Sequence, residues 1–185
     1  MQVIELEADH QWLKGIRRVP SPNCDERPAG AEISLLVVHG ISLPPGQYGG
    51  PYIDQLFTNS LNPDEHPYFG KIHKLRVSSH LMINREGMIT QYVPFHLRAW
   101  HAGESEFKGR KACNDFSIGI ELEGCDDQPY EQVQYKILSE VIKAFENCWG
   151  DIKRECIVGH CDIAPGRKTD PGIAFDWKYF FELLD

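Results

Sequence analysis

Three side chains of metal-binding types, His39, His160 and Asp170, occur where a folded chain can hold ligands rigidly. His39 ends the most apolar run of the chain, residues 35–39, and the other two lie in one turn-rich segment, 159–172. Two histidines and one carboxylate leave a tetrahedral Zn²⁺ with its fourth position open to water, which is the pattern of catalytic zinc sites. This set predicts a metal-dependent hydrolase.

The residue types alone leave two questions open at this site. Asp162 competes with Asp170 as the third ligand, and an aspartate before Pro-Gly is also a common N-cap of a helix. Glu121 and Glu123 lie on one face of a predicted strand, so either carboxylate is a candidate to take a proton from an attacking water. A surface or packing role is the alternative interpretation of each side chain.

The elements that must position these residues alternate between strand and helix patterns. Strands are predicted at 33–39, 80–83, 88–93, 117–123 and 155–158, and helices at 52–61, at 130–149 and after Pro171. Gly150 is expected to end the long helix. Interleaved strands and helices indicate an α/β or α+β fold with helices packed on a sheet.

The predicted strand at 117–123 has apolar residues at every second position, so its other residues share the opposite face. Ser117 and Gly119 on that face are small, and we expect them to leave room for a substrate or a metal. The loop at 42–51 is rich in glycine and proline and directly follows His39, so it is expected to form one wall of a site.

Length and composition favour one globular domain, residues 1–185. The net charge of −8 argues against a nucleic-acid binder, which needs a basic face. We expect a cytoplasmic protein without a membrane span, since the acidic start resembles no secretory leader and no apolar run approaches about 18 residues. The six cysteines form no C-x-x-C motif, so reduced thiols are expected. No obligate protein partner is evident.

Several motifs together resemble the AmpD-type N-acetylmuramoyl-L-alanine amidases, cytoplasmic bacterial enzymes of cell-wall recycling. The resemblance covers nearly the whole chain and is carried by segments 18–22, 38–39, 42–46, 66–69, 91–95, 100–103, 114–124 and 159–172. The wider family includes phage amidase lysozymes and peptidoglycan-recognition proteins. The resemblance implies a central mixed β-sheet flanked by helices.

The resemblance also implies roles for particular residues. It implies Zn²⁺ held by the two histidines and Asp170, rather than Asp162. It places the catalytic acid and base at Glu121 and a catalytic cation at Lys168. The substrate that it implies is an anhydromuramyl peptide, cut between the lactyl carbonyl of the sugar and the amine of L-alanine.

Four residues are candidate substrate contacts: Arg76, Trp100, Arg110 and Asn114. Arg76 suits a stem-peptide carboxylate because its planar guanidinium binds bidentately. Trp100 offers an aromatic face on which a sugar ring can stack. Asn114 lies in a motif that carries the resemblance.

The chain departs from the resembling sequences at two positions. They often have Asn where this chain has Gly40, and Arg where it has Ala112. Both departures concern substrate contacts rather than the metal ligands. Arg110 or Lys111 is a candidate replacement for the missing charge.

Three other functions compete with a zinc amidase. A non-catalytic peptidoglycan-fragment binding module would lack part of the metal set, which this chain retains. A cysteine hydrolase would pair Cys161 with His160, but adjacent residues of an extended segment point to opposite sides. A structural zinc protein would fill the fourth metal position, which the two histidines and one aspartate leave open.

Overall fold

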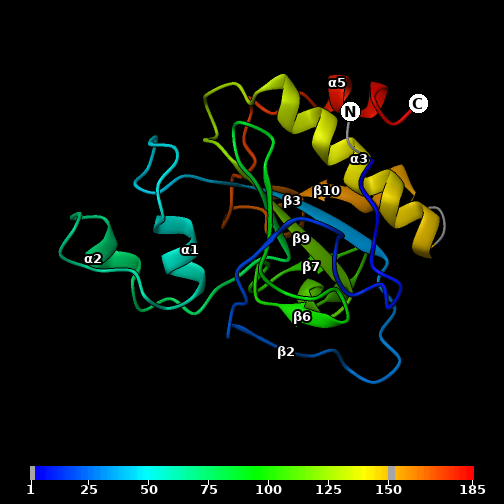
Figure 1. The fold of residues 1–185 in the computed structure, drawn as a ribbon, viewed down its shortest axis with the longest axis horizontal. Helices are drawn as coiled ribbons and strands as arrows, with labels where there is room; N and C mark the ends of the chain where they lie inside the picture. Colours follow the sequence, from blue (N-terminus) through cyan, green and yellow to red (C-terminus); the bar gives the residue numbers. More distant parts are fainter. Residues whose placement is uncertain (1–2, 150–152) are drawn as a thin grey trace.

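The computed structural model describes residues 3–149 and 153–185, and within them a six-stranded sheet forms the centre of the molecule (Figure 1). The strand order is β1-β5-β4-β9-β3-β10. The strands are β1 (Arg17–Arg18), β3 (Leu35–Ile41), β4 (Leu81–Ile83), β5 (Ile89–Gln91), β9 (Ser117–Glu123) and β10 (Ile157–Gly159). Neighbouring strands of this sheet are parallel except β4 and β5, so the expected mixed sheet is confirmed.

Helices and short β-pairs cover the two faces of the sheet. Helices α3 (Gln132–Trp149) and α5 (Trp177–Glu182) lie together on one face (Figure 1). The opposite side carries α1 (Tyr52–Phe57), α2 (Phe69–Ile72), α4 (His160–Ile163), the antiparallel pairs β2 (Cys24–Glu26) with β6 (Leu97–Ala99) and β7 (Glu106–Phe107) with β8 (Arg110–Lys111), and η1 (Cys113–Asp115). A further 3-10 turn, η2 (Arg154–Cys156), precedes β10.

The apolar run of β3 is buried on both faces of the sheet, as its unbroken hydrophobicity predicts. Leu36 and Val38 belong to the cluster beneath α3 and α5. Leu35 and Val37 belong to a separate cluster on the other face. Because strand residues alternate between faces, His39 projects on the side of Leu35 and Val37, away from α3.

Strand β9 places its acidic face beside that histidine. It runs parallel to β3 in a register that pairs His39 with Glu121. Its isoleucines and leucine pack toward α3, and all seven of its residues are buried. Therefore the face that carries Glu121 and Glu123 is not a solvent-exposed strand face.

The structure corrects the expected start of the C-terminal helix. Pro171 lies outside any helix, and α5 begins at Trp177. The N-cap is Asp176, whose side chain accepts a hydrogen bond from the backbone N–H of Tyr179 at 2.9 Å. Asp170 is therefore not a helix cap. The expected helix stop at Gly150 lies outside the described residues.

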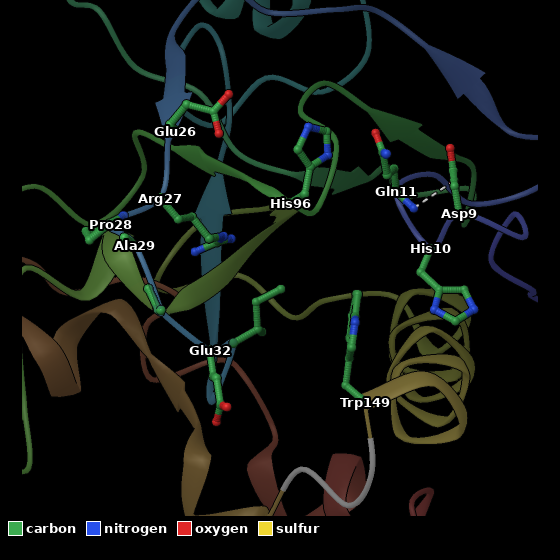
Figure 2. A pocket seen from close by; sticks show the side chains of 13 residues that line it. Asp9, His10, Gln11, Glu26, Arg27, Pro28, Ala29, Glu32, His96 and Trp149 are labelled. Atoms are coloured by element: carbon green, nitrogen blue, oxygen red, sulfur yellow. Dashed lines mark hydrogen bonds between the residues drawn. The ribbon is translucent and has the colours of Figure 1, made fainter.

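A cavity of about 860 Å³ lies beside Trp149, the last residue of α3 (Figure 2). Arg27 is one of the residues that line it, and its guanidinium is largely buried. The guanidinium donates hydrogen bonds to the backbone carbonyls of Phe95, Asn114, Asp115 and Ser117. Through these hydrogen bonds Arg27 links the backbone of η1 to that of Ser117, the first residue of β9.

Among residues 3–149 and 153–185, we find no helix with both the length and the apolar character needed to cross a bilayer. All six cysteines lie in the part of the chain that the structure describes, and there they form no disulfide.

Candidate metal centre and catalytic site

His39, His160 and Asp170 meet where β3 and β10 end. Nδ1 of His39 lies 3.0 Å from Nδ1 of His160 and 3.1 Å from Oδ2 of Asp170. Nδ1 of His160 lies 3.0 Å from the same carboxylate oxygen. Asp162 is engaged elsewhere, because its Oδ2 accepts a hydrogen bond from the N–H of Gly159 at 2.7 Å. The structure thus brings Asp170, and not Asp162, to the two imidazoles.

The charge states of this group suit a divalent cation. Burial lowers the pKa of His39 to about 4, although the adjacent Asp170 carboxylate opposes the shift. Burial disfavours the charged form of Asp170, but the adjacent imidazoles of His160 and His39 outweigh this and hold its pKa well below the usual value. A neutral imidazole and an ionised carboxylate are the protonation states that metal binding requires.

The ring nitrogens that face away from this group are also held. Nε2 of His160 lies 3.2 Å from the carbonyl oxygen of Ala102, and Nε2 of His39 lies 2.9 Å from Nδ1 of His101. Both partners come from one short loop, residues 100–103. Partners of this kind orient the ligands of metal sites in proteins.

The two candidate carboxylates of β9 have different surroundings. Glu123 accepts hydrogen bonds from the backbone N–H groups of Gly49 and Arg85, one on each oxygen. Glu121 is also buried, but its Oε2 has no hydrogen-bond partner among the described residues. Burial raises the pKa of Glu121 well above its usual value; Asp170 adds to the shift, and Lys168 opposes it. Glu121 is therefore the carboxylate with a free oxygen beside the candidate metal-binding group of His39, His160 and Asp170.

One cavity of about 470 Å³ joins these groups. Its polar side is lined by His39, Glu121, His160, Lys168 and Asp170. Lys168 is exposed and lies at the rim of the cavity. Its apolar side is formed by Leu43, Leu56, Phe57, Tyr68, Ile72, Leu75 and Val77. The loop at 42–51 contributes Ser42, Leu43 and Pro45, so it forms a wall of the cavity as predicted.

The small residues of β9 do not leave open space, contrary to expectation. The ring of His101 covers Gly119, where an added Cβ would lie 2.4 Å from the ring carbon Cγ. Oγ of Ser117 lies 3.0 Å from Nε2 of the same ring. The space beside Ser117 and Gly119 is therefore filled by the buried imidazole ring of His101. His101 was not among the residues predicted for the site, although two small residues facing a predicted site were a signal for a packed ring.

All four candidate substrate contacts lie outside the lining of this cavity, and three of them have other surroundings or are exposed. Arg76 is exposed on the segment after α2. Nε1 of Trp100 donates a hydrogen bond to Asp25 at 2.9 Å, and the guanidinium of Arg110 lies 3.8 Å from the ring centroid of Phe116. Their role in substrate binding stays a prediction.

The fourth candidate, Asn114, supports the loop at 100–103. Its Oδ1 accepts hydrogen bonds from the backbone N–H of His101 at 3.1 Å and of Ala102 at 2.8 Å. These are the two residues that contact the outer nitrogens of the clustered histidines. A substrate contact of Asn114 also stays a prediction.

The two departures from the resembling sequences have different surroundings. Gly40 lines the cavity, and a Cβ at this position would lie 2.3 Å from the hydroxyl oxygen of Tyr130. That hydroxyl donates a hydrogen bond to the carbonyl of Pro171 at 2.9 Å, so Tyr130 fills the space that a side chain at position 40 would need. Ala112 is exposed, with φ of 58°.

Cys161 is poorly suited to act as a nucleophile. It lies in helix α4, and not in the extended segment expected from the sequence. Burial and the nearby Asp162 and Asp170 raise the pKa of its thiol, which disfavours the reactive thiolate. Both ring nitrogens of His160 already have other partners.

This architecture is shared with solved structures of AmpD and AmiD. A crystal structure of a selenomethionine AmpD derivative superposes with a TM-score of 0.92 at 54% identity, covering 97% of this chain and 100% of that chain. The Escherichia coli amidase AmiD in complex with the substrate anhydro-N-acetylmuramic acid-L-Ala-D-γ-Glu-L-Lys gives a TM-score of 0.60 at 28% identity, covering 99% and 66%. A sequence model of N-acetylmuramoyl-L-alanine amidases matches residues 29–173. The chain belongs to the N-acetylmuramoyl-L-alanine amidase family.

Within this family the chain is an AmpD-type member. It is 59% identical over 173 residues to the 1,6-anhydro-N-acetylmuramyl-L-alanine amidase AmpD of Escherichia coli K12, covering 94% of both chains. The resemblance inferred from the motifs is confirmed.

Proposed function

We propose that this chain is a zinc-dependent amidase of cytoplasmic peptidoglycan recycling. Its substrate would be an anhydromuramyl peptide, hydrolysed between the lactyl group of the sugar and L-alanine. One observation carries the proposal: the metal-binding group of two histidines and Asp170 shares a cavity with the unpartnered, buried carboxylate oxygen of Glu121. The names of the AmpD relative and of the AmiD complex support the same substrate class.

The donor set fits zinc. Two imidazoles and one carboxylate, with an open fourth position, are a common ligand set of catalytic zinc. His39, His160 and Asp170 would hold the ion, and both outer ring nitrogens are already fixed. When bound, zinc supplies a Lewis acid that activates water and polarises the scissile carbonyl.

Glu121 would carry the protons of the reaction. Its free Oε2 accepts a proton from the attacking water and then delivers it to the departing amine of L-alanine. Its raised pKa suits this role, because the carboxyl group must hold the proton between the two steps. General acid–base catalysis of this kind contributes about 10²- to 10⁴-fold to a rate.

Lys168 would stabilise the negative charge that develops on the substrate carbonyl. Its exposed ammonium group lies at the rim of the same cavity, on the loop that leads to Asp170. Loss of one such donor typically costs about 3–4 kcal/mol of transition-state stabilisation. We expect Lys168→Ala to lower the turnover number while zinc binding is retained.

Product analysis by mass spectrometry tests the proposal. The protein is incubated with anhydromuramyl-tripeptide or with the corresponding N-acetylmuramyl-tripeptide, with and without chelator, and its bound metal is measured in parallel. We expect free tripeptide from the anhydro substrate, loss of activity on chelation, and recovery on addition of zinc. Undiminished cleavage by metal-free protein would refute zinc dependence. Binding without cleavage would instead indicate a binding module.

Glu121→Gln tests the assignment of the proton carrier. We expect stoichiometric zinc with a turnover number reduced by about 10²- to 10⁴-fold. Glu123→Gln is the matched control on the same strand face, since its carboxylate is occupied by backbone N–H groups. If the two variants lose activity equally, or Glu121→Gln turns over normally, the assignment is wrong.

A further inference from the structure

We infer that His101 is a positioning residue for the metal ligand His39, and that with Ser117 it fixes the His39 ring so that Nδ1 presents its lone pair to the metal. The inference rests on the zinc site proposed above. It concerns two residues outside the ligand set.

A chain of three hydrogen bonds links His39 to a backbone carbonyl. Nε2 of His39 lies 2.9 Å from Nδ1 of His101, and Nε2 of His101 lies 3.0 Å from Oγ of Ser117. The Ser117 hydroxyl lies 2.6 Å from the carbonyl oxygen of Cys113. All four residues are buried, so water does not compete for these bonds.

The carbonyl group of Cys113, at the end of this series, sets the direction of all three hydrogen bonds. A carbonyl oxygen can only accept, so the hydroxyl proton of Ser117 points to Cys113. Oγ of Ser117 then accepts the proton of Nε2 of His101. A neutral imidazole protonated at Nε2 has an unprotonated Nδ1, which accepts the Nε2 proton of His39. Nδ1 of His39 is left with its lone pair facing His160 and Asp170.

The surroundings of the middle ring favour this direction, because its Nδ1 faces His39, its Nε2 faces the Ser117 hydroxyl, and all three side chains are buried. The reverse direction would put a proton on Nδ1 of His39, where a cation must bind. It would also take the hydroxyl proton of Ser117 away from the carbonyl of Cys113.

The surrounding fold holds the His101 ring in place. Gly119 has no side chain, which allows the ring to lie against β9. Asn114 accepts hydrogen bonds from the N–H groups of His101 and Ala102, and Arg27 binds the carbonyls of residues 114, 115 and 117 from the cavity of Figure 2. The loop at 100–103 therefore has a fixed position relative to both imidazole ligands.

A pair of serine variants tests the inference. Ser117→Ala removes the hydroxyl that directs the chain. Ser105→Ala is the matched control, because Ser105 is also buried and also hydrogen-bonds the backbone of Cys113, at 3.1 Å, but is not part of the His101 chain. The dissociation constant for zinc is measured by competition with a chromophoric chelator. We expect a loss of about 10-fold for Ser117→Ala, at the lower end of the effect of outer-shell partners, and none for Ser105→Ala.

Variants of His101 itself give a graded response. His101→Phe keeps a ring over Gly119 but provides no acceptor, so we expect zinc binding to weaken by about 10- to 100-fold. His101→Asn should recover part of this loss, because its amide oxygen can accept the proton of His39. If His101→Phe does not fold, the serine pair decides the question.

Nitrogen-15 spectra of histidine-labelled, zinc-loaded protein provide a readout that a packing role would not change. In the parent protein we expect His101 to be protonated at Nε2 and unprotonated at Nδ1. In Ser117→Ala we expect a mixture of the two neutral tautomers of His101. Protonation of Nδ1 in the parent protein would overturn the inference, as would equal zinc affinities of the two serine variants. A parent protein that binds no zinc would refute the proposed function and this inference with it.

Discussion

At the scale of single residues, Glu121 and Glu123 differ in their hydrogen-bond partners, although they share one strand and one face. Backbone N–H groups from two loops occupy both oxygens of Glu123, which ties those loops to β9. No described residue donates to Oε2 of Glu121, so burial of this carboxylate is uncompensated. An uncompensated buried charge lowers stability, and proteins tolerate it chiefly where function requires it.

This difference predicts a dependence of stability on pH in the zinc-free protein. The pKa of Glu121 is raised by folding, so between its usual value and the raised one the folded state holds a proton that the unfolded state has released. The free energy of unfolding therefore falls as pH rises through this range. Glu121→Gln cannot ionise, and we expect it to be more stable than the parent protein at neutral pH.

Urea unfolding at about pH 5 and about pH 8 measures this effect. The zinc-free parent should lose stability between the two conditions by more than zinc-free Glu121→Gln does. Identical pH profiles would show that Glu121 ionises in the folded protein as it does in the unfolded chain.

Gly40 predicts a second effect at the residue scale. Gly40→Ala would place a Cβ 2.3 Å from the Tyr130 hydroxyl, and overpacking of this kind costs about 1–3 kcal/mol. Tyr130→Phe alone loses one hydrogen bond to Pro171, worth about 0.5–1.5 kcal/mol. The double variant removes the clashing oxygen, so its loss should be smaller than the sum of the two. Additive losses in a chemical-unfolding cycle would contradict the contact.

At the scale of elements, the site is built where two neighbouring parallel strands end. β3 and β10 run in the same direction, so His39 and His160 reach the same edge of the sheet. The register of β3 and β9 sets Glu121 beside His39. Binding groups of α/β proteins gather at such carboxyl ends of strands. The loop at 100–103 then supplies the partners that orient both rings.

The support of that loop by Asn114 predicts a distinct phenotype. Asn114→Ala leaves two backbone N–H groups, those of His101 and Ala102, without their acceptor. We expect faster hydrogen exchange of these two amides and weaker zinc binding, because both ligand histidines lose fixed partners. Unchanged zinc affinity with a raised KM would instead indicate that Asn114 acts mainly as a substrate contact.

At the scale of the whole molecule, the proposed metal ligands join segments that are distant in sequence. His39 lies near the first strands, and Asp170 precedes the C-terminal helix α5. A ligand that binds only the folded chain stabilises the entire cooperative unit. We expect free zinc at about 1,000 times its dissociation constant to raise the free energy of unfolding by about 4 kcal/mol.

Thermal unfolding with chelator and with added zinc measures this linkage. The parent protein should unfold at a higher temperature with zinc, and Asp170→Asn should show a much smaller rise, since it lacks the anionic ligand. An equal rise in the two proteins would place zinc binding elsewhere in the chain.

The sequence by itself determined the main strands of the sheet, the long helix and the chemical types at the site. Buried strands and the long helix α3 are visible as periodic hydrophobic patterns, because each pattern depends only on which faces of a local segment avoid water. The hairpin between β4 and β5 follows from its turn residues in the same way. The candidate ligands were recognisable because they follow such strands or lie in a motif.

The resemblance implied Asp170 and Glu121, but only the tertiary structure shows which candidates meet and what each one touches. The approach of Asp170, and not Asp162, to the two imidazoles depends on the path of the chain after α4. Glu123 differs from Glu121 because loops distant in sequence donate N–H groups to it. Asp176, not Asp170, caps the last helix, and His101 fills the space beside Ser117 and Gly119. These outcomes depend on contacts between distant segments, whose geometry is set by packing and hydrogen bonding of the whole chain and leaves no local periodicity to read.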